Sequence, residues 1–149
     1  MRAFYTDGAS KHNGKAGQQK AYICVTDEDG KAIVDKFIGN HTNIEAEGYA
    51  LIACFEYIYK NGIKDAEVRT DSKFWADAIY GKWKLKKPHL FPIRDRLYKG
   101  YDYLNLSGSV LTIKWVNREE SKAGWHLENQ YKTKAQQKKN TPPITPIVK

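Results

Sequence analysis

The order in which extended and helical patterns follow one another is the feature that most limits the folds open to this chain. Three apolar runs suited to β-strands come first, at about residues 2–7, 20–26 and 32–38. The turn sequence Asp27-Glu28-Asp29-Gly30 joins the second run to the third as a hairpin. The three strands are therefore expected to form an antiparallel meander.

Helices and strands alternate in the rest of the chain. Residues 44–60 carry apolar side chains at helical spacing and end at Asn61-Gly62, a helix stop signal. The later elements are expected to be a strand at 66–70, a short helix at 72–80, a helix at 88–103, a strand at 109–116 and a helix at 120–137. This order predicts an α/β protein with one five-stranded mixed sheet, in which two parallel strands join the meander and helices flank the sheet.

The length of 149 residues suits one domain, expected at 1–138, followed by a Pro/Lys-rich tail at 139–149 that is expected to be disordered. No apolar run approaches the roughly 20 residues of a membrane span, and the first strand begins directly after Met1. Cys24 and Cys54 lie in apolar stretches without metal-like spacing, which favours buried free thiols. We expect a cytoplasmic monomer that does not act at a membrane.

The charge balance favours a polyanionic partner. The chain has 25 Lys and Arg against 17 Asp and Glu, a net charge of +8, and such a basic domain most often binds nucleic acid. Part of the excess lies in lysines near the C-terminus, but the remainder is still positive. The basic run from Lys82 to Lys87, with Trp83 and Trp75, suggests a surface that follows a DNA backbone. A solvated face, and a core position for Trp75, are the structural alternatives.

Two aspartates stand where strands end. Asp7 precedes Gly8 at the end of the first strand, and Asp71 follows the strand at 66–70. If those two strands are parallel neighbours, both carboxylates meet at one edge of the sheet, where functional groups of α/β sheets collect. An ordinary turn at Asp7-Gly8 and helix capping by Asp71 are the alternatives.

The helix at 44–60 adds a third acid. Glu47 shares the apolar stripe of Ala50, Leu51 and Cys54, whereas Glu45 lies on a more polar face. A carboxylate on a core-facing stripe is costly unless it is paired or binds a metal. We therefore choose Glu47 as the third member of the site, with a buried acid satisfied by a hydrogen bond as the alternative.

Short motifs occur in a fixed order between these elements. They are Asp7-Gly8-Ala9-Ser10 with the Asn13-Gly14 loop, Thr42-Asn43-Ile44-Glu45-Ala46-Glu47, Thr70-Asp71-Ser72, Gly81-Lys82-Trp83-Lys84 through Lys87-Pro88-His89-Leu90, and Trp115-Val116-Asn117-Arg118-Glu119-Glu120. Together they resemble type 1 ribonuclease H, in particular its archaeal and plant-like branch, over about residues 2–130.

The resemblance implies a ribonuclease-H-like fold and an endonuclease that hydrolyses the RNA strand of RNA–DNA hybrids, leaving 5′-phosphate and 3′-hydroxyl ends. It implies that Asp7, Glu47 and Asp71 are catalytic carboxylates that bind Mg²⁺, with Mn²⁺ as a substitute. Two Mg²⁺ ions held by clustered carboxylates suit phosphodiester hydrolysis, because magnesium prefers oxygen ligands.

The fourth carboxylate of the family is where this sequence departs. The usual Asn-x-x-Ala-Asp pattern is replaced by Ser121-Lys122-Ala123-Gly124-Trp125, so the aspartate position falls on Trp125, or on Gly124 if the loop shifts by one. We expect Glu128, on the same side of the helix, to lean back toward the missing position as the fourth catalytic and metal-binding acid.

Other residues near the fourth position leave alternatives open. Glu120 and Glu119 lie in the preceding loop and are less well placed, and Glu128 could be an ordinary exposed helix acid. His126 is compatible with a proton shuttle, a metal ligand or a plain surface position.

Substrate contacts are expected around the acids and on the basic run. Asn13 and Asn43 match family positions that contact the RNA strand through its 2′-hydroxyls, the group that distinguishes RNA from DNA. The full expected set is Gly8, Ser10, Asn13, Asn43, Ser72, Lys82, Trp83 and Lys84. Helix capping is the structural alternative for Asn43 and Ser72.

Two other functions remain open on the sequence. The absent fourth aspartate is compatible with a catalytically weakened module that binds nucleic acid or a partner, although the three retained acids argue against it. A related nuclease that acts on DNA is a further alternative, which the Thr42–Glu47 motif disfavours.

Overall fold

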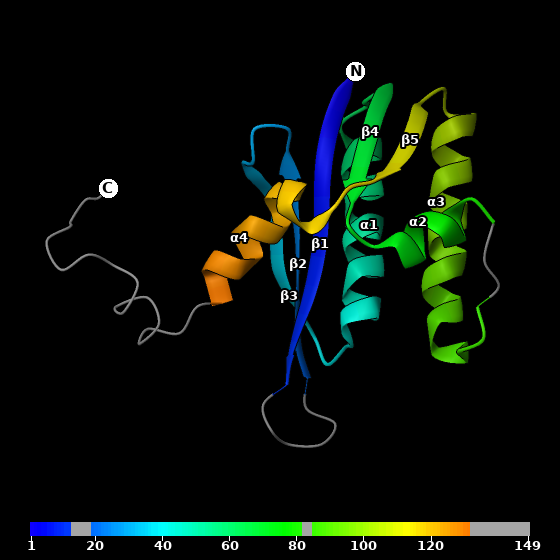
Figure 1. The fold of residues 1–149 in the computed structure, drawn as a ribbon. Helices are drawn as coiled ribbons and strands as arrows, with labels where there is room; N and C mark the ends of the chain where they lie inside the picture. The colour runs from blue at the N-terminus through cyan, green and yellow to red at the C-terminus, as the bar shows by residue number, and fades with distance from the viewer. Residues whose placement is uncertain (13–18, 82–84, 132–149) are drawn as a thin grey trace, which may run out of the picture.

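Five strands form one mixed sheet with helices on both faces (Figure 1). The computed structural model describes residues 1–12, 19–81 and 85–131. In chain order the elements are β1 Arg2–His12, β2 Gln19–Asp27, β3 Ala32–Gly39, α1 Asn43–Lys60, β4 Asp65–Thr70, α2 Lys73–Ile79, η1 Pro88–Leu90, α3 Phe91–Leu106, β5 Val110–Trp115, η2 Arg118–Glu120 and α4 Lys122–Tyr131, where η marks a 3₁₀ turn.

The strand order in the sheet is β3-β2-β1-β4-β5. β1 pairs antiparallel with β2, which pairs antiparallel with β3. β4 is parallel to both β1 and β5. The predicted meander with two added parallel strands is therefore confirmed.

β1 is longer than the strand predicted at 2–7. Its second half, from Gly8 to His12, continues the pairing with β2 as far as His12 opposite Gln19. Backbone pairing satisfies the N–H and C=O groups whatever the side chains are. The prediction from the sequence therefore ended this strand several residues too early, because the residues that follow are polar.

The two faces of the sheet have separate apolar layers. α1 and α3 pack on one face, and the main core there includes Phe4, Val25 and Val68. On the other face α4 packs on β1 and β2 and encloses a small cluster with Tyr5 and Cys24. The alternation of neighbouring residues between the two layers is that of a strand buried on both faces.

α1 begins and ends at defined signals. Thr42 caps its first turn, accepting a hydrogen bond from the backbone N of Glu45, while the Glu45 side chain accepts one from the backbone N of Thr42. This reciprocal pair is a capping box. At the other end Gly62 has a φ of 61°, a left-handed conformation that glycine adopts without strain. Glu45 is thus occupied in capping, and Glu47 is free for the site.

The last helices start later than predicted. Residues 88–90 form the 3₁₀ turn η1 before α3. α4 begins at Lys122 because Arg118–Glu120 form the turn η2, in which the Asn117 side chain accepts a hydrogen bond from the backbone N of Glu120. The predicted tail at 139–149, the end of the predicted helix at 120–137 and the basic residues Lys82, Trp83 and Lys84 lie outside the described residues.

Cys24 and Cys54 are both buried and unpaired, as predicted. Within the described ranges, no helix combines the length and apolar character that a bilayer span requires.

Candidate active site

Three carboxylates meet at the carboxyl end of β4, beside the middle of β1. The parallel register sets Thr6 opposite Thr70, so the next residues, Asp7 within β1 and Asp71 directly after β4, lie side by side. Glu47 reaches them from the N-terminal part of α1. Ligand oxygens of the three acids all lie within 4.8 Å of one another. The structure therefore brings together the three acids that the sequence singled out.

The close approach of α1 to β1 depends on Gly8. A Cβ atom at position 8 would lie 2.2 Å from the carbonyl carbon of Ala46 and 2.4 Å from the backbone N of Glu47. Only a residue without a side chain fits such a contact. Gly8 was predicted to contact substrate. Its position shows a structural role, because the lack of a side chain lets α1 come close enough to β1 to bring Glu47 next to Asp7.

Ser72 holds two parts of the site in place. Its hydroxyl accepts a hydrogen bond from the backbone N of Trp75 and so caps α2. The same side chain is hydrogen-bonded to the carboxylate of Glu47. Because Ser72 is the cap, the Asp71 carboxylate is not used for capping. Oδ1 of Asp71 is buried without a hydrogen-bond partner among the described residues.

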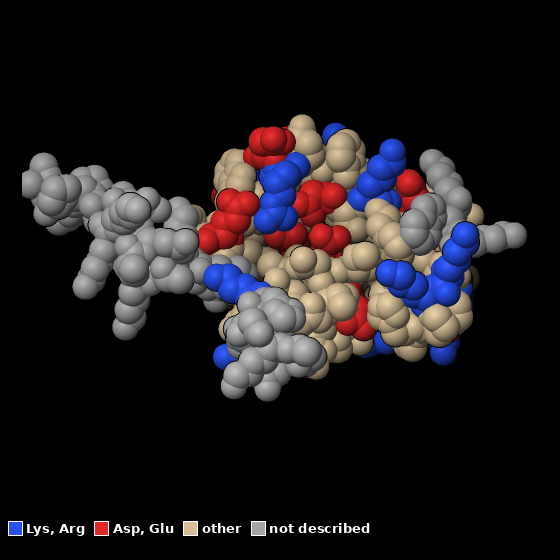
Figure 2. All heavy atoms as spheres, turned by 60° about the horizontal axis from the view of Figure 1, so that its bottom comes forward, with Lys and Arg blue, Asp and Glu red and all other residues tan. Residues whose placement is uncertain are grey.

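Arg118 reaches the same carboxylates from η2. Its Nη1 donates to Oδ2 of Asp71 at 2.8 Å and to both oxygens of Asp7 at 3.3 and 3.2 Å. Its Nε and Nη2 are each 3.3 Å from Oε1 of Glu128 on α4. Figure 2 shows a face of the molecule on which acidic side chains gather and basic side chains stand directly against them.

The pKa values of two of these acids are raised. Burial, followed by the charge of Asp71, raises the pKa of Asp7 to about 8, although Arg118 acts in the opposite direction. Burial also raises the pKa of Glu47 to about 7, against the hydrogen bond from Ser72. For Arg118, burial lowers the pKa, but the hydrogen bond to Asp71 and the neighbouring negative charges outweigh it, so the net shift is upward.

The donor set fits a hard divalent cation. Three carboxylates within a few ångströms provide oxygen ligands only, which is the chemistry that Mg²⁺ and Mn²⁺ prefer. The buried Oδ1 of Asp71, without a partner among the described residues, is an oxygen that such an ion would satisfy. Asp7, Glu47 and Asp71 are therefore the residues that could hold a metal ion.

We predict that the free energy of unfolding falls as pH rises from about 4 to about 8. Asp7 and Glu47 have pKa values in the folded chain above the ordinary values of 3.8 and 4.5, so the folded state binds more protons in this window. Each extra bound proton lowers stability by about 1.4 kcal/mol per pH unit. Urea unfolding at several pH values without divalent ions measures the slope. The Asp7→Asn variant should show a shallower slope, and equal slopes would contradict the prediction.

The fourth family position lies closest to Asp7 at Gly124. A Cβ atom there would be 3.4 Å from Oδ2 of Asp7, whereas Trp125 is 49% exposed and lines a cavity beside the β2–β3 turn. This favours the alignment shifted by one residue. Glu128, one helical turn after Gly124, is 58% exposed and joins the site through Arg118. In the described residues the close acidic group comprises only Asp7, Glu47 and Asp71.

The other acids and the histidine near α4 are not directed into the cluster. Glu119 and Glu120 are exposed in η2. His126 forms an ion pair with Asp35 of β3, with 2.8 Å between Nε2 and Oδ2. This contact ties α4 to the meander and favours the structural interpretation of His126.

Two of the expected substrate residues meet at the start of α1. The Asn43 side chain accepts a hydrogen bond from the backbone N of Ser10 at 2.6 Å, and Thr42, not Asn43, caps the helix. The hydroxyl of Ser10 is buried and lacks a hydrogen-bond partner among the described residues. Trp75 is fully buried and donates to the carbonyl of Ile44, so it is a core residue. Asn13, with Lys82, Trp83 and Lys84, lies outside the described residues.

The sequence interpretation missed Arg118. The residue stands inside the quoted run Trp115–Glu120, but only the acids of that run were considered. A cation in the loop before the last helix, facing two strands that end in acids, was the available signal. The contacts of Arg118 depend on the backbone path of the turn η2. The sequence predicted a helix from residue 120 and no turn before it.

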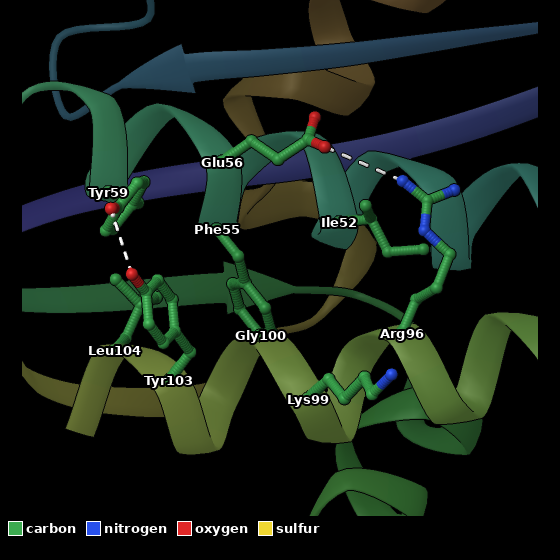
Figure 3. Close-up of a pocket in the computed structure, with 9 residues that line it drawn as sticks. All are labelled: Ile52, Phe55, Glu56, Tyr59, Arg96, Lys99, Gly100, Tyr103 and Leu104. Carbon is green, nitrogen blue, oxygen red and sulfur yellow. Dashed lines mark hydrogen bonds and ion pairs between the residues drawn. The ribbon is translucent and has the colours of Figure 1, made fainter. Parts of the chain in front are cut away.

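A cavity between α1 and α3 lies away from the carboxylates (Figure 3). It encloses about 290 Å³ and is lined by Phe55, Tyr59, Arg96 and Tyr103, among others. Its residues on α1 begin at Ile52, more than one turn beyond Glu47. Asp7, Glu47 and Asp71 are not among the residues that line this cavity.

Comparison with known proteins identifies relatives over most of the chain. Residues 5–127 match the model of the family described as reverse transcriptase-like. The bifunctional protein Rv2228c of Mycobacterium tuberculosis is 30% identical over 124 residues, which is 83% of this chain and 33% of that protein. The chain thus spans about a third of the length of this curated relative.

Solved structures show the same fold. Ribonuclease H1 from the halophilic archaeon Halobacterium salinarum is 29% identical, with 86% of this chain and 98% of that chain covered and a TM-score of 0.62. LC11-RNase H1, isolated from compost by a metagenomic approach and solved in complex with an RNA/DNA hybrid, is 26% identical, with 81% and 88% covered and a TM-score of 0.58. The chain belongs to the reverse transcriptase-like family and is a ribonuclease-H-like domain.

Proposed function

We propose that this protein is an endoribonuclease that hydrolyses the RNA strand of RNA–DNA hybrids in a metal-dependent reaction. The convergence of Asp7, Glu47 and Asp71 within 4.8 Å carries the proposal. The similarity to ribonuclease H1 structures, one of them solved with an RNA/DNA hybrid, supports it. The net charge of +8 suits a nucleic acid substrate.

The acids have distinct roles in the proposed reaction. Mg²⁺, with Mn²⁺ as a substitute, activates a water molecule and stabilises the leaving oxygen of the phosphodiester when it is bound by clustered carboxylates. Asp7 would hold the metal together with Glu47 and Asp71. Glu47, oriented by Ser72, accepts a proton from the attacking water, and Asp71 and Glu128 complete the set. Cleavage of the bond between the phosphorus and the 3′ oxygen leaves 5′-phosphate and 3′-hydroxyl ends.

Recognition of the RNA strand would fall to the residues at the start of α1. The buried Ser10 hydroxyl and the side-chain amide nitrogen of Asn43 are suited to the 2′-hydroxyl, which both donates and accepts hydrogen bonds. The basic run at Lys82, Trp83 and Lys84 would follow the DNA strand through its phosphates.

The proposal is tested with three labelled substrates: an RNA–DNA hybrid, duplex RNA and duplex DNA, each with Mg²⁺, with Mn²⁺ and with neither. Metal-dependent cleavage confined to the RNA strand of the hybrid is expected. Binding of the hybrid without cleavage under both metals would favour the second candidate, a weakened nucleic-acid-binding module. The observation that favours that candidate is Gly124, which supplies no carboxylate next to Asp7.

We predict that Glu128→Gln lowers the rate of hybrid cleavage by more than about tenfold, because it removes the fourth acid from the site. Glu120→Gln is the matched control, since Glu120 is an exposed acid of η2 that does not belong to the close group of three carboxylates. Initial rates at saturating Mg²⁺ and at lower concentrations separate a loss of metal binding from a loss of chemistry. An unchanged cleavage rate in Glu128→Gln together with a lowered rate in Glu120→Gln would show that Glu128 is not the fourth carboxylate.

A further inference from the structure

The guanidinium of Arg118 lies among the oxygens that a metal ion would use. Its Nη1 is 2.8 Å from Oδ2 of Asp71 and 3.2 Å from Oδ2 of Asp7, so one nitrogen is shared by both acids. The opposite edge of the same guanidinium contacts Glu128. A single side chain therefore spans three of the four acids assigned to the proposed reaction.

A guanidinium and a divalent ion compete for these oxygens. Mg²⁺ sits about 2.0–2.1 Å from its oxygen ligands in near-octahedral geometry. Binding between Asp7 and Asp71 would bring the ion against the positive charge of Nη1, and like charges a few ångströms apart repel strongly when partly buried. A metal ion on both aspartates thus works against the contacts of Nη1 with them.

Arg118 is placed so that it can leave. Its side chain is 47% exposed, and it belongs to the short turn η2 and not to a packed helix. Asp7, in contrast, is buried and is on the central strand of the sheet. Exchange of the cation therefore needs a side-chain movement of Arg118 and no change in the sheet.

We propose that Arg118 is a resident counter-cation of the carboxylate site, and that divalent ions bind by displacing its guanidinium from Asp7 and Asp71. The inference rests on the proposed metal-dependent function. By neutralising clustered acids, Arg118 allows the strands and α1 to hold them together without an added ion. The same contacts weaken metal binding, so Arg118 helps to set the Mg²⁺ concentration at which the protein acts.

Mg²⁺ affinity, measured by isothermal titration calorimetry without nucleic acid, tests the competition directly. Arg118→Gln is expected to tighten Mg²⁺ binding about tenfold, which corresponds to about 1.4 kcal/mol. Arg118→Lys should tighten it less, since an ammonium keeps the charge but lacks the planar fork that spans Asp71 and Glu128. The two variants separate loss of charge from loss of geometry.

Removing any positive charge would favour a divalent cation to some extent, so a charge-matched control is needed. Lys122→Gln changes the net charge by the same amount, and the Lys122 amine bonds to the carbonyl of Glu28 and not to the cluster. Its effect on Mg²⁺ affinity should stay below about twofold at 0.15 M salt, where distant exposed charges are screened. An equal effect of Lys122→Gln and Arg118→Gln would overturn the displacement.

Nuclear magnetic resonance of the arginine side chains gives a second readout in the unmodified chain. The Nε–H signal of Arg118, assigned by its loss in Arg118→Gln, should shift on Mg²⁺ addition with the midpoint found by calorimetry. An unmoved signal while the ion binds, an unchanged or weaker affinity in Arg118→Gln, or no Mg²⁺ binding by either protein would each overturn the proposal. Hybrid cleavage is measured separately. If the protein cleaves the hybrid but Arg118→Gln does not tighten Mg²⁺ binding, only this inference is wrong. If Arg118→Gln tightens Mg²⁺ binding but the hybrid is not cleaved, only the proposed nuclease activity is wrong.

Discussion

The Asp7→Asn variant should lose hybrid cleavage by at least roughly a thousandfold while remaining folded. Asp7 is buried on the central strand, and its carboxylate lies within 4.8 Å of ligand oxygens of both Asp71 and Glu47, so its loss removes the innermost acid of the group. Asparagine has the same shape but cannot provide a charged ligand. Because burial raises the pKa of Asp7 to about 8, a neutral side chain fits the buried position at least as well as the carboxylate does.

Initial rates on the labelled hybrid with Mg²⁺ and thermal unfolding at pH 8 together test this expectation. Asp35→Asn is the matched control, because Asp35 pairs with His126 away from the cluster. The control should retain cleavage, and Asp7→Asn should unfold at the wild-type temperature or higher. An Asp7→Asn protein that cleaves at the wild-type rate would overturn the whole assignment of the site.

The second large effect is expected for Gly8→Ala, which should destabilise the fold by about 3 kcal/mol or more. The added methyl group would lie 2.2–2.4 Å from backbone atoms of Ala46 and Glu47. Backbone atoms cannot rotate out of the way, so α1 must move off β1. That movement would separate Glu47 from Asp7, and we expect the folded fraction to cleave poorly as well.

Gly100→Ala is the control for a tight glycine of a different kind. There the new methyl group would lie 3.1 Å from a ring carbon of Phe55, a side chain that can shift, and the position is inside α3. Alanine is also a better helix former than glycine by up to about 1 kcal/mol. The two variants should therefore differ by several kilocalories per mole in urea unfolding. Equal stabilities would mean that β1 and α1 do not meet as closely as the structure shows.

Much of the fold follows from local pattern alone. The alternation of Phe4 with Tyr5 and the helical stripe that includes Leu51 are repeated signals, and each fixes the type of an element. The strand register that unites Asp7 with Asp71 then follows once β1 and β4 are parallel neighbours. These steps require only periodicity and the rules of sheet topology.

The remaining features depend on contacts between distant segments. The extension of β1 beyond Ala9 is decided by pairing with β2, and the approach of α1 is decided by backbone atoms of Ala46 meeting Gly8. Arg118 enters the site because η2 turns the chain there. No local periodicity encodes such contacts, so the acids could be predicted while their cation partner could not.

The shared register of β1 and β4 also determines where residues can be inserted or deleted without disrupting the site. Side chains alternate between the faces of a strand, so one residue inserted or deleted between Arg2 and Thr6, or between Ala66 and Thr70, would send an aspartate to the opposite face. Over evolutionary time, length variation should therefore be absent from these two strands.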